Sequence, residues 1–237
     1  ADSVRFRGRQ YSLDGRRFYM WYCSLRFFIQ GIFYVEESDK MKFRMKFSVN
    51  QMVKIGVLSA LSLVLMFLIR FPLIPAAPFL EYEPADVPIL IGTFLYGPVT
   101  GLIMTAIVSL IQAMTVSAGS GWIGAVMHMA ATGALVLIAG LVYKKLHTFR
   151  GAIIGLSSGI VAMTVVMTGL NLVFTPMFMG VPVEAVKAML IPVIIPFNLL
   201  KGLMNSVLVC MVYKHVSRLF KAEQSIVIKA DRTQKTT

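Results

Sequence analysis

The chain has 237 residues, of which 57% are hydrophobic and 14% are charged, and its mean hydropathy is +0.75. These values are typical of an integral membrane protein and exclude an ordinary soluble domain. A formal net charge of +12 could indicate nucleic-acid binding. A basic excess on one side of a lipid bilayer explains it better, so we expect no nucleic-acid partner. The two cysteines, Cys23 and Cys210, are far apart and predict neither a disulfide framework nor a metal site.

Residues 1–40 differ in composition from the rest of the chain. They are rich in arginine and aromatic residues, and no small-residue cleavage site follows an apolar core as in a signal peptide. We expect a disordered N-terminal extension or leader, with a natural start at Met41 or Met45. An amphipathic arm on the membrane surface is the alternative. The membrane domain is expected at residues 41–220, followed by a polar cytoplasmic tail at residues 221–237.

The first apolar run covers residues 53–69, about the minimum length for a membrane-spanning helix. Gly56 and Ala60 lie four residues apart in it, a spacing that lets another helix approach closely. A proline-rich segment follows at residues 70–88. Its five prolines exclude a continuous helix, yet it is too apolar for a simple solvated loop. We predict a folded cap on the membrane face and use that name for residues 70–88.

The cap is acidic because it contains Glu81, Glu83 and Asp86. For Glu81 and Glu83 two interpretations are open. They are either solvated or cap-anchoring groups, or they contact a ligand.

The later apolar runs complete a helical membrane protein. Residues 87–116 are interrupted at Gly97–Pro98 and form either one kinked span or two short spans. Two spans place every basic cluster on one side of the membrane, so we predict two, the first short and shielded by its neighbours. Further spans are expected at residues 122–143, 151–170 and 191–213, and glycines near the start of the second of these predict close helix packing. The predicted fold is all-α, with six transmembrane helices, both termini cytoplasmic, and an extracellular proline-rich cap loop.

The last of these spans contains a lysine, Lys201, within an apolar sequence. A charged group inside a membrane is costly unless it faces a cavity or a partner, so it is a functional hypothesis by default. Asn198 and Asn205 lie on the same helical face. At 1.5 Å per residue, Lys201 lies ~20 Å above the cytoplasmic end of the helix, in the outer third of the bilayer. The alternatives are that Lys201 extends to the outer interface and that Asn205 bonds to another helix.

The polar groups of the predicted spans suit ligand binding better than catalysis. The sequence contains no P-loop or HExxH motif, and no chain of protonatable residues crosses the membrane. His128 is interpreted as a packing residue rather than a ligand-binding one. Asparagine donates and accepts hydrogen bonds and lysine donates them, so together they suit a polar, mostly uncharged molecule. The candidate binding residues are Asn171, Asn198, Lys201 and Asn205.

Four segments resemble one protein family in their order and spacing. They are GVLSALSLVL (56–65), FLEYEPADVPIL (79–90), FLYGPVTGL (94–102) and PFNLLKGLMN (196–205). This pattern, over about residues 45–220, resembles the riboflavin-binding S components of energy-coupling factor (ECF) vitamin transporters. The resemblance implies high-affinity riboflavin binding and uptake in the cell membrane of a Gram-positive bacterium. It implies no enzyme activity, no cofactor and no metal.

The resemblance also implies partners and site residues. A transmembrane coupling protein and two ATPase subunits would power transport, and Gly56 and Ala60 would dock on the coupling protein. Asn171, Asn198 and Lys201 would bind the isoalloxazine and ribityl parts, and FMN or roseoflavin are further possible ligands. The cap would cover the ring through Ala77, Phe79, Leu80 and Glu81. The alternatives are an S component for thiamine or biotin, an autonomous secondary carrier, and a membrane-embedded enzyme.

Overall fold

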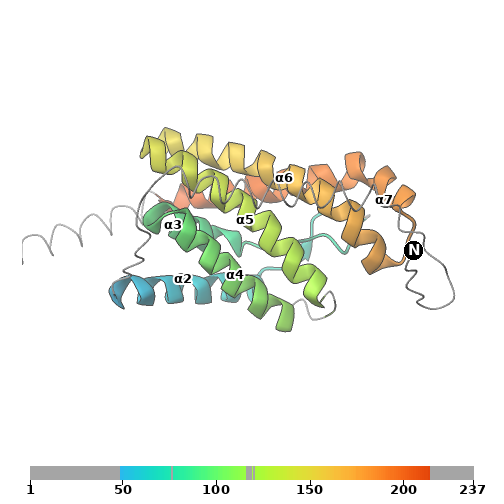
Figure 1. Cartoon of the computed structure of the whole chain (residues 1–237), viewed down its shortest axis with the longest axis horizontal. Helices are drawn as coiled ribbons and strands as arrows, with labels where there is room; N and C mark the ends of the chain where they lie inside the picture. The colour runs from blue at the N-terminus through green and yellow to red at the C-terminus, as the bar shows by residue number, and fades with distance from the viewer. Residues whose placement is uncertain (1–48, 76, 116–118, 120, 214–237) are drawn as a thin grey trace, which may run out of the picture. The chain divides into compact units, whose positions relative to one another are not determined.

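The computed structural model describes residues 49–75, 77–115, 119 and 121–213, which belong to one compact unit (Figure 1). The predictions for residues 1–40 and 221–237 lie outside these residues. The described elements are α2 (Val49–Leu68), β1 (Phe71–Pro72), β2 (Glu81–Tyr82), α3 (Asp86–Tyr96), α4 (Pro98–Met114), α5 (Gly121–Leu146), α6 (Phe149–Met179), α7 (Val183–Met189) and the π-helix η1 (Leu190–Ile194). Residues 195–213 continue as an α-helix, which we call the last described helix.

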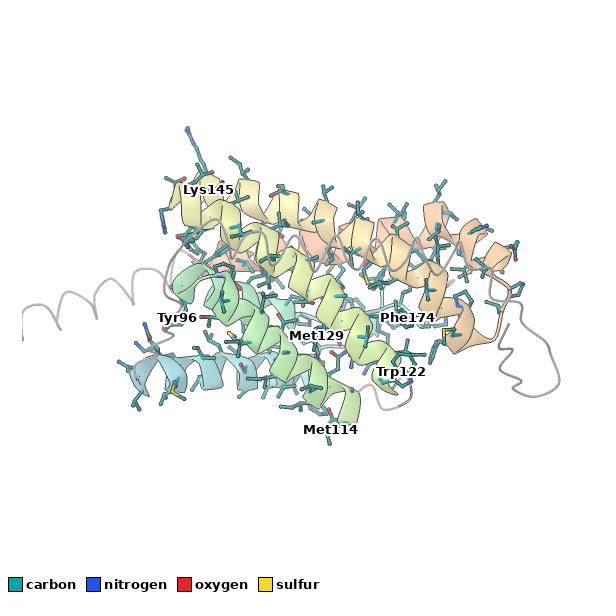
Figure 2. All side chains as sticks on the ribbon, viewed as in Figure 1. Tyr96, Met114, Trp122, Met129, Lys145 and Phe174 are labelled. Carbon is teal, nitrogen blue, oxygen red and sulfur yellow. The ribbon has the colours of Figure 1, made fainter. Side chains whose placement is uncertain are left out.

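Among the described residues, four stretches are long and apolar enough to cross a membrane: α2, α5, α6 and the continuous helical stretch Val183–Tyr213. The outer surfaces of the described helices are apolar, and large side chains such as Met114 of α4 and Trp122 of α5 are exposed (Figure 2). An exposed apolar surface of this extent is unfavourable in water and favourable in lipid. The prediction of a helical integral membrane protein is therefore confirmed.

The two shorter helices, α3 and α4, have 11 and 17 residues. They meet at Gly97, whose φ of 94° is readily adopted only by glycine, and Pro98 then occupies the first turn of α4. The residues of α3 from Asp86 to Phe94 are all buried. Helix α3 is thus enclosed by its neighbours, as its short length predicted, and its first residue lies inside the protein.

Close packing of α5 against α6 depends on glycine. A Cβ atom on Gly155 would lie 2.8 Å from the carbonyl oxygen of Ala139, and one on Gly159 would lie 2.8 Å from that of Leu135. Backbone atoms cannot move aside as easily as side chains can, so these positions require glycine. The predicted close-packing face of this helix is present.

Helix α6 extends further than the sequence predicted. The predicted span ended at residue 170, whereas the helix continues through Pro176 and ends at Met179. Pro176 lies in the last turn, where the lost hydrogen bond affects only the helix end. Gly180, with a φ of 67°, then terminates the helix in the left-handed conformation typical of a C-terminal glycine. The extension places Asn171 and Thr175 on the same helix.

The cap is folded onto the bundle. β1 and β2 pair antiparallel, with Phe71 opposite Tyr82. The interior of the cap forms a small core with α7, η1 and the start of the last described helix. The buried members of this core are Ala77, Leu80, Val186, Ile194 and Phe197. Apolar contacts therefore hold the cap against α7, η1 and the start of the last described helix, and these contacts do not depend on a ligand.

Candidate functional site

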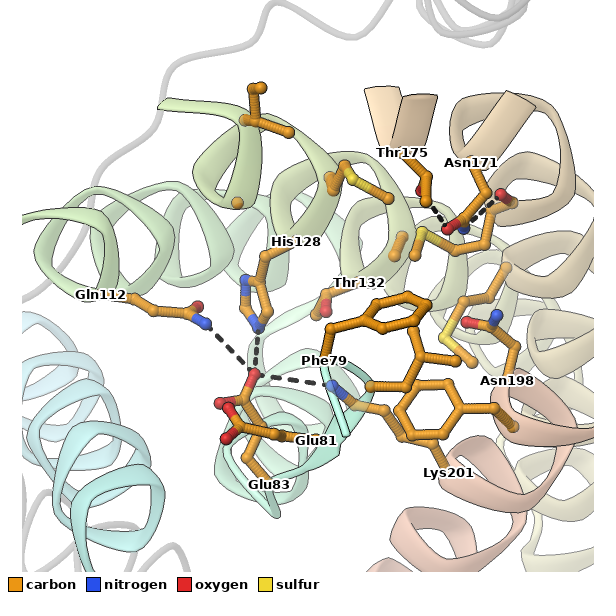
Figure 3. A pocket seen from close by; sticks show the side chains of 18 of the residues that line it. Phe79, Glu81, Glu83, Gln112, His128, Thr132, Asn171, Thr175, Asn198 and Lys201 are labelled. Atoms are coloured by element: carbon orange, nitrogen blue, oxygen red, sulfur yellow. Dashed lines mark hydrogen bonds and ion pairs between the residues drawn. The ribbon is translucent and has the colours of Figure 1, made fainter. Parts of the chain in front are cut away.

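A cavity of about 180 Å³ lies between the cap and helices α4, α5, α6 and the last described helix (Figure 3). Part of its wall is apolar and includes Phe79, Leu80, Met163, Met167 and Phe197. The rest is polar and includes Glu83, Gln112, His128, Asn171, Asn198 and Lys201. An apolar pocket with a few converging polar groups is the usual form of a small-molecule site.

Two predicted binding residues, Asn171 and Asn198, line this cavity and are almost fully buried. The Asn171 side chain donates to the carbonyl oxygen of Met167 at 2.8 Å and accepts from the Thr175 hydroxyl at 2.7 Å. The Asn198 amide nitrogen donates to the carbonyl oxygen of Ile194 at 2.8 Å. Among the residues that the structure describes, nothing donates a hydrogen bond to the Asn198 side-chain oxygen. Asn198 therefore retains an acceptor for a ligand.

Lys201 also lines the cavity, and its side chain is 14% exposed. Its ammonium lies 3.5 Å from the Glu83 carboxylate, which also accepts a hydrogen bond from Gln112 at 3.2 Å. The lysine is thus directed toward the interior, to an anionic partner on the cap. The interpretation of Glu83 as a solvated group is wrong, because this residue is 5% exposed.

Asn205 occupies a different environment from Asn198, although the two share one helical face. It is fully buried and does not line the cavity. Its side-chain oxygen accepts from the Tyr82 hydroxyl at 2.9 Å, and its nitrogen donates to Asp86 at 3.0 Å. Burial, followed by the nearby Asp86 charge, raises the pKa of Tyr82, so the phenol remains a donor. These contacts favour the interpretation of Asn205 as a residue that joins helices.

His128 contacts two acidic residues that no sequence pattern placed beside it. Its Nδ1 lies 2.7 Å from the Ser109 hydroxyl, and its Nε2 lies 3.6 Å from Asp86 and 4.0 Å from Glu83. Asp86 in turn accepts from the Thr132 hydroxyl at 2.7 Å. The sequence predicted only that His128 is a packing residue. Its partners are distant in the chain and meet it because α3 begins inside the bundle.

The cap residues divide into two groups. Phe79, Leu80 and Glu81 line the cavity, whereas Ala77 lies in the core of the cap and does not. Glu81 forms an ion pair with Arg70 at the rim.

Among the described residues, no group of histidine, cysteine and acidic side chains could hold a metal ion.

The predicted docking residues lie on an exposed face of α2. Gly56 and Ala60 are both exposed, and a Cβ atom on Gly56 would meet nothing within 4 Å. Neither position is packed inside the described part of the chain. Both are therefore available to another helix.

Residues 50–213 match the family model described as "ECF transporter, substrate-specific component". The chain belongs to this family. It is 30% identical over 173 residues to the riboflavin transporter FmnP of Bacillus subtilis (strain 168), covering 70% of this chain and 90% of that relative. It is 30% identical over 178 residues to the riboflavin transporter RibU of Staphylococcus aureus (strain TCH60), covering 73% and 93%. The sequence-based assignment is confirmed.

Two solved structures extend the comparison. An S component of a bacterial ECF transporter is 30% identical, with a TM-score of 0.64 over 73% of this chain and 98% of that one. An S component for biotin is 18% identical, with a TM-score of 0.50 over 71% and 95%. The second similarity shows a shared fold alone.

Proposed function

We propose that this S component binds riboflavin and mediates its uptake as part of an ECF-type ABC transporter. The observation that carries the proposal is a cavity lined by Asn171, Asn198 and Lys201 together with the apolar side chains of Phe79 and Leu80. The names of the two relatives, both riboflavin transporters, support the same ligand.

The chemistry of riboflavin suits this cavity. Its flat ring system can pack against the aromatic side chains of Phe79 and Phe197 and the aliphatic side chain of Leu80, which line the cavity. One edge of the ring alternates carbonyl and N–H groups, which the donor and acceptor of an asparagine amide can match. The ribityl hydroxyls leave water only if other hydrogen bonds replace it, so the buried amides and Lys201 would also confer selectivity. FMN and roseoflavin share the ring system and are further candidate ligands.

The proposed topology is the one that the sequence predicts. Six helices lie in the cell membrane of a Gram-positive bacterium, with both termini cytoplasmic, and the cap is extracellular. The chain would not hydrolyse ATP itself. Two ATPase subunits would supply the energy through a transmembrane coupling protein, which docks on α2 at Gly56 and Ala60.

Riboflavin titration of the purified protein tests the proposed ligand. Bound flavin is expected to colour the preparation yellow, and titration should quench flavin fluorescence until the sites are saturated. Thiamine and biotin are the matched controls and should not compete. A colourless protein without saturable riboflavin binding would refute the proposal, and binding of thiamine or biotin would reassign the ligand. Uptake into vesicles that contain only this chain would instead indicate an autonomous carrier.

A further inference from the structure

A cluster of ionisable side chains beside the cavity has charges that do not balance. Glu83 and Asp86 are 5% and 1% exposed. Within the described part of the chain, the only ammonium in contact with either carboxylate is that of Lys201, 3.5 Å from Glu83. With two carboxylates and one ammonium, the cluster carries one net negative charge while His128 is neutral. An unbalanced buried charge is unfavourable because the protein interior solvates it far less than water does.

His128 is placed to hold the balancing proton. Its Nε2 is buried without a hydrogen-bond partner in the described structure and lies 4.0 Å from Glu83 (Figure 3). The same nitrogen lies 3.6 Å from Asp86. A bare nitrogen would direct its lone pair at these carboxylates, whereas an N–H group would direct a positive hydrogen at them. Nε2 is therefore the protonated nitrogen of the neutral ring. A second proton on Nδ1 would make the whole cluster neutral.

The partner of Nδ1 accommodates both states of the ring. The Ser109 hydroxyl lies 2.7 Å away and can donate to a bare nitrogen or accept from an N–H group. Protonation of Nδ1 therefore requires only that this hydroxyl rotate. Neither state leaves Nδ1 without a hydrogen bond.

Among the residues that the structure describes, groups from the neighbouring elements add no other balancing charge. From α4, Gln112 contacts Glu83 but is neutral. The side chains that α6 contributes to the cavity are all uncharged. At the rim, Arg70 pairs with Glu81. Tyr82 reaches Asp86 only through Asn205 and keeps its proton.

We propose that ligand binding in this cavity is accompanied by uptake of a proton from solvent at Nδ1 of His128. This inference rests on the proposed function, in which Lys201 donates a hydrogen bond to riboflavin. A lysine that turns toward the ligand interacts less with Glu83, so His128 then has to balance more of the negative charge. Because proton and ligand binding are linked, affinity rises as the pH falls, until His128 is protonated in the free protein as well.

Calorimetry in two buffers tests this inference. Riboflavin is titrated into the purified protein in phosphate and in Tris at the same pH. The two buffers differ in protonation enthalpy, so the difference in heat gives the number of protons taken up. We expect a net uptake of up to one proton near neutral pH. We also expect a Kd lower by up to about tenfold at pH 6 than at pH 8, the change that corresponds to a one-unit shift in proton affinity.

Two histidine variants provide the comparison. His128→Asn should bind riboflavin without proton uptake and with a Kd that does not depend on pH. His147→Asn is the matched control, because His147 lies outside the cavity and its φ of 46° suits asparagine. This control should take up as many protons as the unmodified protein.

The outcomes separate the two proposals. Saturable riboflavin binding with equal heats in both buffers and a flat pH profile would overturn proton uptake and leave riboflavin binding intact. The absence of saturable binding would overturn the proposed function itself. Full proton uptake by His128→Asn would assign the proton to another group and so overturn the role of His128. If that variant does not fold, Ser109→Ala replaces it, and uptake equal to that of the unmodified protein would count against the inference.

Discussion

Asn198 and Asn205 lie on one face of the same helix, yet the structure predicts opposite consequences of replacing them by alanine. Asn205→Ala leaves the Tyr82 hydroxyl without its acceptor and removes a donor from Asp86, both buried. An unsatisfied buried group costs about 1–3 kcal/mol, so with two groups affected we expect a loss of about 2–6 kcal/mol in the free energy of unfolding. Asn198→Ala removes one bond to the carbonyl of Ile194 in its own helix and should cost less than about 1 kcal/mol.

Riboflavin affinity should show the reverse order. Asn198 lines the cavity, so its replacement should weaken binding by about 1–3 kcal/mol, whereas folded Asn205→Ala protein should bind nearly normally. Thermal unfolding in detergent without ligand measures the first effect, and fluorescence titration measures the second. If Asn205→Ala is too unstable to purify, Tyr82→Phe removes one of its bonds and should cost about 1 kcal/mol. Equal stabilities of the two asparagine variants would refute the reasoning.

Three further predictions concern other parts of the chain. Gly56→Leu should leave riboflavin binding unchanged and impair transport by the assembled complex, whereas Gly169→Leu, at another exposed and uncrowded helical glycine, should impair neither. Gly159→Ala should lower the free energy of unfolding by about 1–3 kcal/mol, since its Cβ atom would lie 2.8 Å from the backbone oxygen of Leu135. An unchanged free energy of unfolding would contradict the close packing of α5 against α6. Arg70→Gln should change stability by less than about 1 kcal/mol, because its ion pair with Glu81 is partly exposed. The same variant should release riboflavin faster in stopped-flow measurements, and an unchanged rate would show that this pair does not hold the cap closed.

Most of the helical architecture could be predicted from the sequence because it depends on local patterns. Apolar runs locate the helices, and Gly97–Pro98 separates α3 from α4 where the prediction placed the break. Gly155 and Gly159 indicated close packing because small residues at helical spacing have few other uses in a membrane. The end of α6 was misplaced because a proline near a helix end is tolerated, and the stop comes only at Gly180.

The candidate site was predicted only in part, because its polar groups come from distant segments. The positions of Asn171, Asn198 and Lys201 at similar depths pointed to a cavity, which the structure contains. The contact of His128 with Glu83 and Asp86 could not be anticipated, since it depends on where α3 starts within the bundle. Helical periodicity assigns a residue to a face of its own helix but does not identify the residue opposite.

The short length of α3 explains how acidic cap residues come to lie inside a membrane protein. A helix of 11 residues extends only ~17 Å at 1.5 Å per residue, about half of a ~30 Å hydrocarbon core. Its N-terminal residue, Asp86, is 1% exposed and lies inside the bundle, where it meets Thr132 and Asn205. The cap must descend into the bundle to reach that residue, and it takes Glu83 with it to the ammonium of Lys201. The short α3 thus leaves room for a cavity lined by cap residues, and it allows Glu83 of the cap to contact Lys201.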